Sequence, residues 1–353
     1  MNEQPLISII MPAYNRGGVI SEAIRSVIEQ TYDNWELIVI DDRSTDRTKE
    51  IVEAFSVSDS RIRYVLNDRA KGPGGARNCG MLAAKGEKLA FLDSDDIWFP
   101  FHLRDSLHTL ATSGAEISFA LWVERHGENV IHNFDNKVEQ KWLAKMRTIN
   151  SVSGEAIVYN DRLFEQFLSH TRNFFQLNTM IFPRKLLDEV GLINEEFYLG
   201  EDTTFLIRFF DRYKIALITK PHSVYTLSPD SVYFFCDRWK LDPDSLYQNK
   251  ELMDKFEALG LKSVKVRTHL RTLVEQSERF AGKERCIRNI NMGISCKYFT
   301  LSYLHRLDRE KAIHYCRLSL QNKVTLFNLL LMMRLMLSIK GGNGLLRKGI
   351  DLW

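Results

Sequence analysis

Short apolar runs alternate with amphipathic segments over the first third of the chain. Continuous runs of isoleucine, valine and leucine are typical of strands buried on both faces, and apolar residues spaced by three or four positions are typical of helices. Strands are expected at 6–11, 35–40, 61–66 and 87–92. Helices are expected between them at 19–30, 44–55 and 75–86. This alternation predicts an α/β fold with a mostly parallel sheet flanked by helices.

The pattern changes after this first third. Residues 125–175 show little periodicity, and we interpret them as a variable insertion. A strand leading into a helix is expected at 177–183, a helix at 201–213 and a strand at 214–219. From about residue 240 the spacing is helical to the end, apart from a glycine-rich break at 341–344.

The length and composition are those of a globular protein. A chain of 353 residues is long for one core, so we expect an α/β domain at 1–235 and an α-helical domain at 236–353. The five cysteines lack a C-x-x-C spacing, which favours buried thiols over a disulfide framework or a zinc site. The sequence contains neither 18 successive uncharged apolar residues nor a basic leader, so we expect no transmembrane helix and a cytoplasmic protein.

Charge is divided unevenly along the chain. Residues 1–235 carry 26 Lys+Arg against 33 Asp+Glu, a net charge of −7, whereas 236–353 carry 22 against 12, a net charge of +10. At the C-terminal end, Lys340, Arg347 and Lys348 stand among leucines, a combination suited to peripheral contact with the inner face of the plasma membrane. Packing or homo-oligomer contacts are the alternative for these helices. The sequence contains no basic stripe interleaved with aromatic residues, so we expect no nucleic-acid partner.

Polar clusters follow the first four expected strands. They are PAYNR at 12–16, DDRSTD at 41–46, NDRAKGPGG at 67–75 and DSDD at 93–96. The ligand of a parallel sheet binds beyond the carboxyl ends of its strands, so these clusters predict a functional site.

The acidic cluster after the fourth strand needs a partner of opposite charge. Asp93, Asp95 and Asp96 lie so close that their charges repel. Mg²⁺ or Mn²⁺, held by one or two carboxylates and by substrate phosphates, would neutralise them. A solvated loop with a helix cap at Asp96 is the alternative. A haloacid-dehalogenase-type nucleophile needs D-x-D-x-T, and Ile97 occupies the threonine position.

Two common nucleotide-binding motifs are missing. The GPGG run at 72–75 is not followed by the Gly-Lys-Ser/Thr of a Walker A loop, and PAYNRGG at 12–18 lacks G-x-G-x-x-G. Arg77, at the start of a helix, suits a diphosphate or a base, and a purely structural arginine fits equally well.

Five segments resemble those of family 2 glycosyltransferases with the GT-A fold, in order and in spacing. They are SIIMPAYNR, ELIVIDDRSTDRT, ARNCG, AFLDSDDIW and YLGEDTTFLIRF. The resemblance covers about residues 6–230. It implies a Rossmann-like, mixed but mostly parallel sheet with a helical C-terminal extension. It also implies an inverting, metal-dependent hexosyl- or N-acetylhexosaminyltransferase whose donor is a nucleotide-diphosphate sugar, with a UDP-sugar expected.

The resemblance assigns nucleotide-binding roles to several residues. They are Pro12, Ala13, Tyr14, Asp42 and Arg77. The first three would line the base and the ribose. Asp42, in preference to Asp41, would accept a hydrogen bond from the base.

The resemblance assigns the metal and the chemistry to acidic residues. Asp93 would lie near the ribose and the metal, Asp95 would be the direct metal ligand, and Asp96 would face the donor sugar. Asp202, with Glu201 beside it, would be the catalytic base on the face opposite the leaving diphosphate. A helix N-terminus favours such a carboxylate, and an ordinary first-turn acid is the alternative.

One element departs from the family pattern. Many members follow the last core strand with an Arg-x-x-His-x-x-Ser-like element that touches the metal or the diphosphate. Here residues 222–232 have the sequence HSVYTLSPDSV, in which only Ser231 matches clearly. The residue that closes over the diphosphate is therefore not identified.

The expected function is transfer of a sugar to a hydroxyl of a growing bacterial surface glycan of lipopolysaccharide or capsule type. A glycan or lipid-linked glycan would be the acceptor. Transfer to a protein or to wall teichoic acid is an alternative within enzymes. An inactive scaffold is disfavoured because Asp42, Asp93, Asp95 and Asp202 are all retained. A nucleotidylyltransferase would need a glycine-rich, arginine-containing first turn, which PAYNRGG does not supply.

Overall fold

The structure is a computed structural model. It describes residues 4–127, 129–159, 163, 174–197, 200–227, 249–278 and 282–337. The chain divides into two compact units, Met1–Phe234 and Phe235–Trp353. The first unit contains the polar clusters predicted to form a site.

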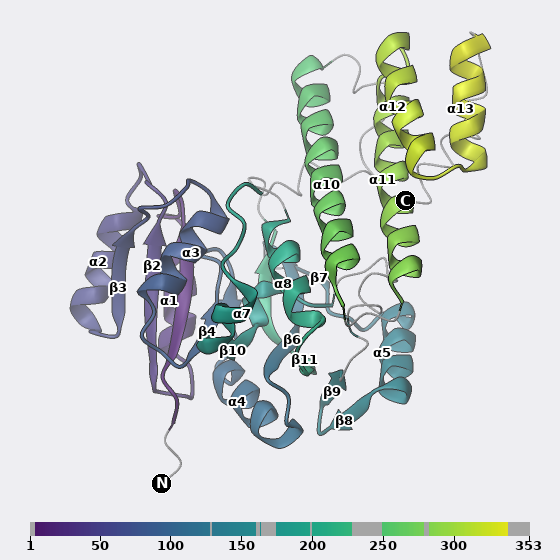
Figure 1. Ribbon diagram of the computed structural model, residues 1–353. Helices are drawn as coiled ribbons and strands as arrows, with labels where there is room; N and C mark the ends of the chain where they lie inside the picture. Colours follow the sequence, from purple (N-terminus) through teal and green to yellow (C-terminus); the bar gives the residue numbers. More distant parts are fainter. Residues whose placement is uncertain are drawn as a thin grey trace. The chain divides into compact units, whose positions relative to one another are not determined.

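Four parallel strands form one half of the sheet in the first unit (Figure 1). Their order is β3-β2-β1-β4, with bounds β1 (Ile7–Ala13), β2 (Trp35–Asp41), β3 (Ile62–Leu66) and β4 (Lys88–Phe91). The helices between them are α1 (Ile20–Ile28), α2 (Thr48–Ser58) and α3 (Pro73–Ala83). These elements confirm the predicted alternation, with ends shifted by a few residues.

The other half of the sheet is mixed. β10 (Ile181–Pro183) runs antiparallel to both β4 and β6 (Ile117–His126), and β11 (Ile215–Thr226) runs parallel to β6. Four further strands pair antiparallel: β9 (Ala156–Tyr159) and β5 (Ile97–Trp98) with β11, β8 (Ser151–Ser153) with β9, and β7 (Asn129–His132) with β6. The mixed, mostly parallel sheet of the fold prediction is confirmed.

Several predicted bounds need correction. The segment 125–175, interpreted as a variable insertion, has elements that its weak periodicity did not predict, because it contains α5 (Lys137–Ile149) and supplies β7, β8 and β9 to the sheet. The strand predicted at 177–183 starts as the 3₁₀ turn η1 (Leu177–Thr179), where Thr179 Oγ1 donates to the Ala120 carbonyl, and only its end is a strand. The last strand extends to Thr226 because pairing with β6 resumes beyond a bulge.

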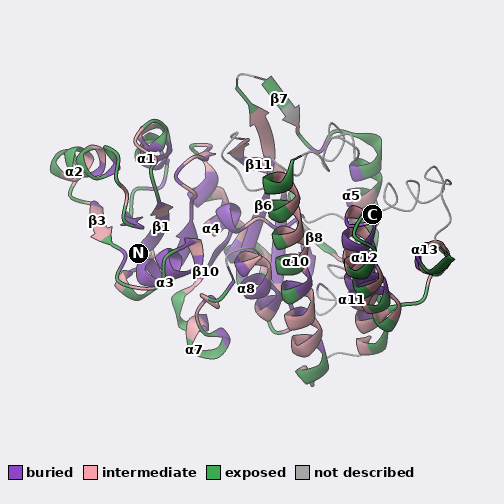
Figure 2. Cartoon of the chain, turned by 90° about the horizontal axis from the view of Figure 1, so that it is seen from above, coloured by how far each residue is buried: buried purple, intermediate pink, exposed green. Residues whose placement is uncertain are grey.

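Helices cover the two faces of the sheet with different partners. Ile9 and Leu37 share one core with Ile24 of α1 and Leu103 of α4 (His102–Ser113). On the opposite face α3 lies very close to β1, because a Cβ at Gly80 would come within 2.4 Å of Ile10. Figure 2 shows that the strands beneath these helices are largely buried.

The helix that carries the predicted catalytic base packs on the same face as α3. It is α8 (Glu201–Phe210), preceded by η2 (Arg184–Leu186) and α7 (Leu187–Val190), and it ends at residue 210 rather than 213. Phe205 contacts Phe91 of β4 and Phe182 of β10 edge to face. These aromatic contacts fix the start of α8 beside the end of β4.

The described part of the second unit is helical. Its helices are α10 (Lys250–Gln276), α11 (Lys283–Leu304), α12 (Arg309–Asn322) and α13 (Leu326–Leu337). Buried Asn328 donates hydrogen bonds to Ser295 and Ser319, which ties α13 to α11 and α12. None of the helices that the structure describes is long and apolar enough to cross a membrane.

Two further predictions concern sets of residues that the structure describes only in part. Cys79 of the first unit and Cys286, Cys296 and Cys316 are buried free thiols, as expected, whereas Cys236 lies outside the described residues. The basic C-terminal end at 338–353 and the glycine-rich break within it also lie outside them.

Candidate active site

The ends of four parallel strands bring the predicted site residues to one edge of the sheet. The Asp42 amide donates to the Ala13 carbonyl at 2.8 Å, and the Asn67 amide donates to the Asp41 carbonyl at 2.8 Å. The peptides that leave β1, β2 and β3 are therefore held side by side. Backbone pairing of β1 with β4 brings the 93–96 cluster to the same edge.

Asp42 is a buried acceptor of two hydrogen bonds, and Arg43 Nη1 also lies 3.8 Å from its Oδ1. Asn67 Nδ2 donates to Oδ1 and the Gly72 amide donates to Oδ2, both at 2.7 Å. Asp41 is occupied differently, because the Tyr64 hydroxyl and the Ser44 amide donate to its carboxylate. Both carboxylates are thus hydrogen-bonded within the protein, and the two donors to Asp42 stand at the ends of residues 67–72, which we call the 67–72 loop.

Tyr14 leaves the end of β1 as a partly exposed aromatic side chain. Its relative exposure is 43%, and Lys71 Nζ lies 4.2 Å from the ring centroid. A flat, accessible ring under a cation is a surface on which a nucleobase can stack beside a positive charge. Pro12 and Ala13 lie within β1 itself.

The three carboxylates after β4 have different partners, and two of them are paired with arginines. Arg77 Nη2 lies 2.7 Å from Asp93 Oδ1, and Arg16 Nη2 lies 3.4 Å from Asp95 Oδ2. Asp96 is 1% exposed and accepts from the Thr226 amide and from Asn178 Nδ2. Asp96 is thus bonded within the protein to β11 and η1.

Burial and mutual repulsion disfavour ionisation of Asp95 and Asp96. Burial, and after it the charge of Asp93, raises the pKa of Asp95. The same two causes, in the same order, raise the pKa of Asp96 well above its ordinary value. Within the described residues, no three His, Cys, Asp or Glu side chains converge as ligands for a metal ion.

Arg77 connects this cluster to the start of α8. Its side chain is 7% exposed, and Nη1 lies 2.9 Å from Glu201 Oε1 while Nη2 binds Asp93. Burial raises the pKa of Glu201 to about 7, opposed by Arg77 and reinforced by Asp202. The guanidinium is therefore enclosed by protein carboxylates.

Asp202 lies in the first turn of α8. Gly200 precedes the helix with φ +75°, a conformation that favours glycine, and the Thr203 amide donates to Asp202 Oδ1 at 2.6 Å. Asp202 is half-buried, whereas its neighbour Glu201 is buried. The second acid of the Glu-Asp pair is thus the one with access to solvent.

The structure adds residues that the sequence did not single out. Asn178 bonds Asp96 and accepts from the Asp93 amide at 3.2 Å, and Arg16 and Asn67 contact Asp95 and Asp42. Glu195 is another residue that the sequence did not single out. The sequence did contain a signal for Asn178, because this polar residue stands within the otherwise largely apolar segment LNTMIFP at 177–183.

Comparison with known proteins places the chain in a family. The profile of "Glycosyl transferase family 2" matches residues 8–178. The UDP-Glc:alpha-D-GlcNAc-diphosphoundecaprenol beta-1,3-glucosyltransferase WfgD of Escherichia coli is 31% identical over 260 residues, which cover 72% of this chain and 85% of that protein. The chain belongs to glycosyltransferase family 2. The resemblance inferred from the sequence is confirmed, and this family 2 chain is a glycosyltransferase.

Solved structures support the fold of this family 2 glycosyltransferase. Staphylococcus aureus TarS 1–349, crystallised with UDP-GlcNAc, superposes with a TM-score of 0.58 at 18% identity, over 90% of this chain and 81% of that one. A mannosyltransferase of Pyrobaculum calidifontis, solved with GDP-Man and Mn²⁺, gives a TM-score of 0.52 at 16% identity, over 99% and 85%.

Proposed function

We propose that this glycosyltransferase inverts the anomeric centre of a UDP-sugar as it transfers the sugar to a hydroxyl of a lipid-linked glycan. The observation that carries the proposal is Arg77, which binds the carboxylate of Asp93 and that of Glu201, next to Asp202. One guanidinium thereby joins the donor-side acidic cluster to the first turn of α8, which carries the candidate base. The relative in Escherichia coli, named for a UDP-Glc donor and a diphosphoundecaprenol-linked acceptor, supports this choice of substrates.

The proposed chemistry is a single in-line displacement. Asp202 accepts the proton of the acceptor hydroxyl as the oxygen attacks the anomeric carbon, and the bond from that carbon to the diphosphate oxygen breaks on the opposite face. Tyr14 stacks on the base and Asp42 accepts a hydrogen bond from it. Arg77 holds the carboxylates of Asp93 and Glu201 in position and does not touch the substrate. This role differs from that of a nucleotide contact, which the resemblance implied.

The residues at the end of β4 fit a divalent metal that takes most of its ligands from the substrate. Asp95 and Asp93 would hold Mn²⁺ or Mg²⁺. Two carboxylates supplemented by diphosphate oxygens are an ordinary set for these hard cations. A half-buried Asp95 whose pKa is raised by burial and by Asp93 gains from a cation beside it. When bound, the metal supplies Lewis-acid stabilisation of the leaving diphosphate.

A peripheral membrane contact would bring a lipid-linked acceptor to the enzyme. One side of α13 carries Leu331 and Leu335, which are buried against its neighbours. Another side exposes a stripe of apolar residues at helical spacing: Leu326, Leu329, Met333, Met336 and Leu337. We assign this stripe, which we call the α13 stripe, to the lipid surface, aided by the net charge of +10 on residues 236–353.

The proposal is tested by incubating the protein with Mn²⁺, a panel of UDP- and GDP-sugars, and GlcNAc-diphosphoundecaprenol. Transfer is expected from a UDP-sugar, with release of UDP and a β-linked product from an α-linked donor. Release of UDP without an extended lipid product would indicate another acceptor, such as wall teichoic acid or a protein. If none of these nucleotide sugars is consumed, the proposed function is wrong.

A further inference from the structure

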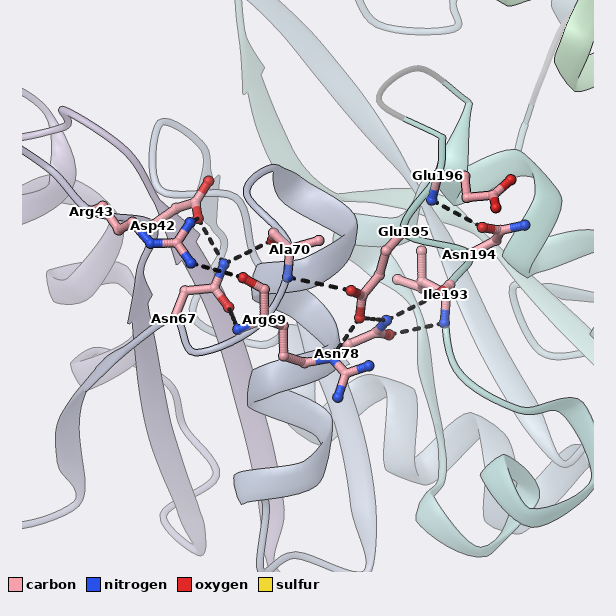
Figure 3. A network of polar contacts seen from close by, with 10 residues as sticks. All are labelled: Asp42, Arg43, Asn67, Arg69, Ala70, Asn78, Ile193, Asn194, Glu195 and Glu196. Carbon is pink, nitrogen blue, oxygen red and sulfur yellow. Dashed lines mark hydrogen bonds and ion pairs between the residues drawn. The ribbon is translucent and has the colours of Figure 1, made fainter.

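One carboxylate collects hydrogen bonds from two segments that border the nucleotide side of the site (Figure 3). Glu195 Oε1 accepts from Arg69 Nε and, at 2.7 Å, from Asn78 Nδ2, while Oε2 accepts from the Ala70 amide at 3.4 Å. Arg69 and Ala70 belong to the 67–72 loop, and Asn78 belongs to α3. Glu195 itself lies between α7 and α8.

The 67–72 loop forms a wall of the proposed base pocket. At its start Asn67 Nδ2 donates to Asp42, and at its end the Gly72 amide donates to the other oxygen of Asp42. Between these points Lys71 lies over the Tyr14 ring. Any displacement of this loop therefore moves the donors on Asp42 and the cation over Tyr14 together.

Glu195 is anchored to α3 and not merely to the loop. Asn78 and Ile193 exchange two hydrogen bonds, from Asn78 Nδ2 to the Ile193 carbonyl at 2.8 Å and from the Ile193 amide to Asn78 Oδ1 at 2.9 Å. A Cβ at Gly74 would lie 3.2 Å from the Ile193 side chain, so helix and segment pack tightly. This attachment gives the carboxylate a fixed position from which to hold the loop.

The bonds to Glu195 favour its charged form. Burial alone would raise the pKa of Glu195, but hydrogen bonds from Asn78 and Arg69 outweigh it and lower that pKa. An ionised carboxylate makes shorter and stronger hydrogen bonds than a neutral one. Its neighbour Glu196 is exposed.

We propose that Glu195 is a positioning residue for donor binding, which holds the 67–72 loop against α3 in the conformation that completes the base pocket around Asp42 and Tyr14. Glu195 does not touch the donor and acts through Arg69 and Ala70. The inference rests on the proposed function, because it requires a nucleotide at Tyr14 and Asp42. It assigns a role to a residue outside the metal and catalytic groups.

The test compares UDP binding by calorimetry in the wild type, Glu195→Gln, Arg69→Gln and the double variant, with Glu196→Gln as the matched control. Loss of one charge-assisted hydrogen bond is expected to weaken UDP binding about tenfold in each single variant. The double variant is expected to bind about as weakly as either single one, because both break the same contact. The kcat for UDP-sugar turnover is expected to stay within about threefold, while KM rises, since Asp202 is unchanged.

Several results would overturn the inference. One is UDP affinity in Glu195→Gln equal to that of Glu196→Gln. Another is a melting temperature that falls without any change in UDP affinity, which would leave Glu195 a purely structural role. Additive losses in the double variant would also contradict it. If Glu195→Gln does not fold, Arg69→Gln decides, because Arg69 is partly exposed. If the wild type binds neither UDP nor GDP, the proposed function itself fails.

Discussion

Arg77 Nη1 lies 2.9 Å from Glu201 Oε1, and both side chains are buried. The same guanidinium binds Asp93, so one cation from α3 holds a carboxylate after β4 and another at the start of α8. A buried charge that loses its partner is left without compensation, and this costs more than the intact pair contributes. Arg77 is therefore expected to be essential to the folded site.

Arg77→Met should lower the free energy of unfolding by about 3–5 kcal/mol, because Asp93 and Glu201 then lose their shared cation. Urea unfolding followed by circular dichroism measures this change. Arg104→Met, at an exposed arginine of α4, should stay within about 0.5 kcal/mol of the wild type. Wild-type stability of Arg77→Met with a loss of UDP binding alone would make Arg77 a direct nucleotide contact instead.

Asp202→Asn should separate catalysis from donor binding. The amide keeps the shape of the carboxylate but accepts no proton, so kcat should fall by about two or more decades. UDP affinity by calorimetry should be nearly unchanged, because the nucleotide contacts lie at the ends of β1 and β2. Asp188→Asn, an exposed acid of α7, is the control and should keep full turnover. Weaker donor binding with normal turnover would show that Asp202 is a donor ligand.

Removal of the divalent metal should abolish transfer. EDTA should stop turnover and added Mn²⁺ should restore it, because the leaving diphosphate then regains its counter-charge. Asp95→Asn should lose this rescue and bind UDP more weakly in the presence of Mn²⁺ while keeping its fold. Asp33→Asn, at an exposed position, should respond to EDTA and Mn²⁺ as the wild type does. Full activity of the wild type in EDTA would contradict the metal assignment.

The sequence predicted the parallel half of the sheet because its strands are short, mostly apolar segments that alternate with helical patterns. It also placed the polar clusters at one edge, since parallel strands end on the same side. The strands of the other half were harder to recognise. β8 and β9 are short, and β11 passes through a bulge at which its pairing with β6 shifts.

The partners of the site residues could not be predicted from periodicity. Asp96 accepts from the Thr226 amide, 130 residues away, and Glu195 accepts from Arg69, 126 residues away. Such contacts depend on the packing of whole elements and leave no local pattern. The motifs therefore indicated which acidic residues form the site. The structure showed which of these residues are already hydrogen-bonded within the protein.

The α13 stripe should bind anionic membranes. Replacing Leu329 and Met333 by serine removes apolar surface that could be buried in the lipid, and should reduce sedimentation with phosphatidylglycerol vesicles at low salt. High salt should weaken binding by the wild type, because it screens the basic residues of this unit. Transfer to a water-soluble acceptor should be unaffected. If the wild type does not bind these vesicles at low salt, α13 contacts a protein surface instead.

A buried histidine pair should make stability sensitive to acid. His102 Nδ1 and His222 Nδ1 are 3.1 Å apart and both side chains are fully buried. Burial lowers the pKa of His222 to about 4, opposed by Asp105 and reinforced by Lys220, and burial also lowers the pKa of His102. An unfolded histidine titrates near 6.5, so between pH 6.5 and 4 the unfolded chain takes up protons that the folded chain does not.

The free energy of unfolding should therefore fall as the pH drops from 6.5 to 4. The shift of His222 alone corresponds to about 3 kcal/mol over this window. Urea unfolding at several pH values measures the slope, which His222→Gln should flatten because glutamine takes up no proton in either state. His108→Gln, at an exposed histidine of α4, should leave the slope unchanged. An equal slope in the wild type and in His222→Gln would mean that carboxylates whose pKa is lowered in the folded protein, such as Glu36 and Glu195, and not His222, dominate the acid response.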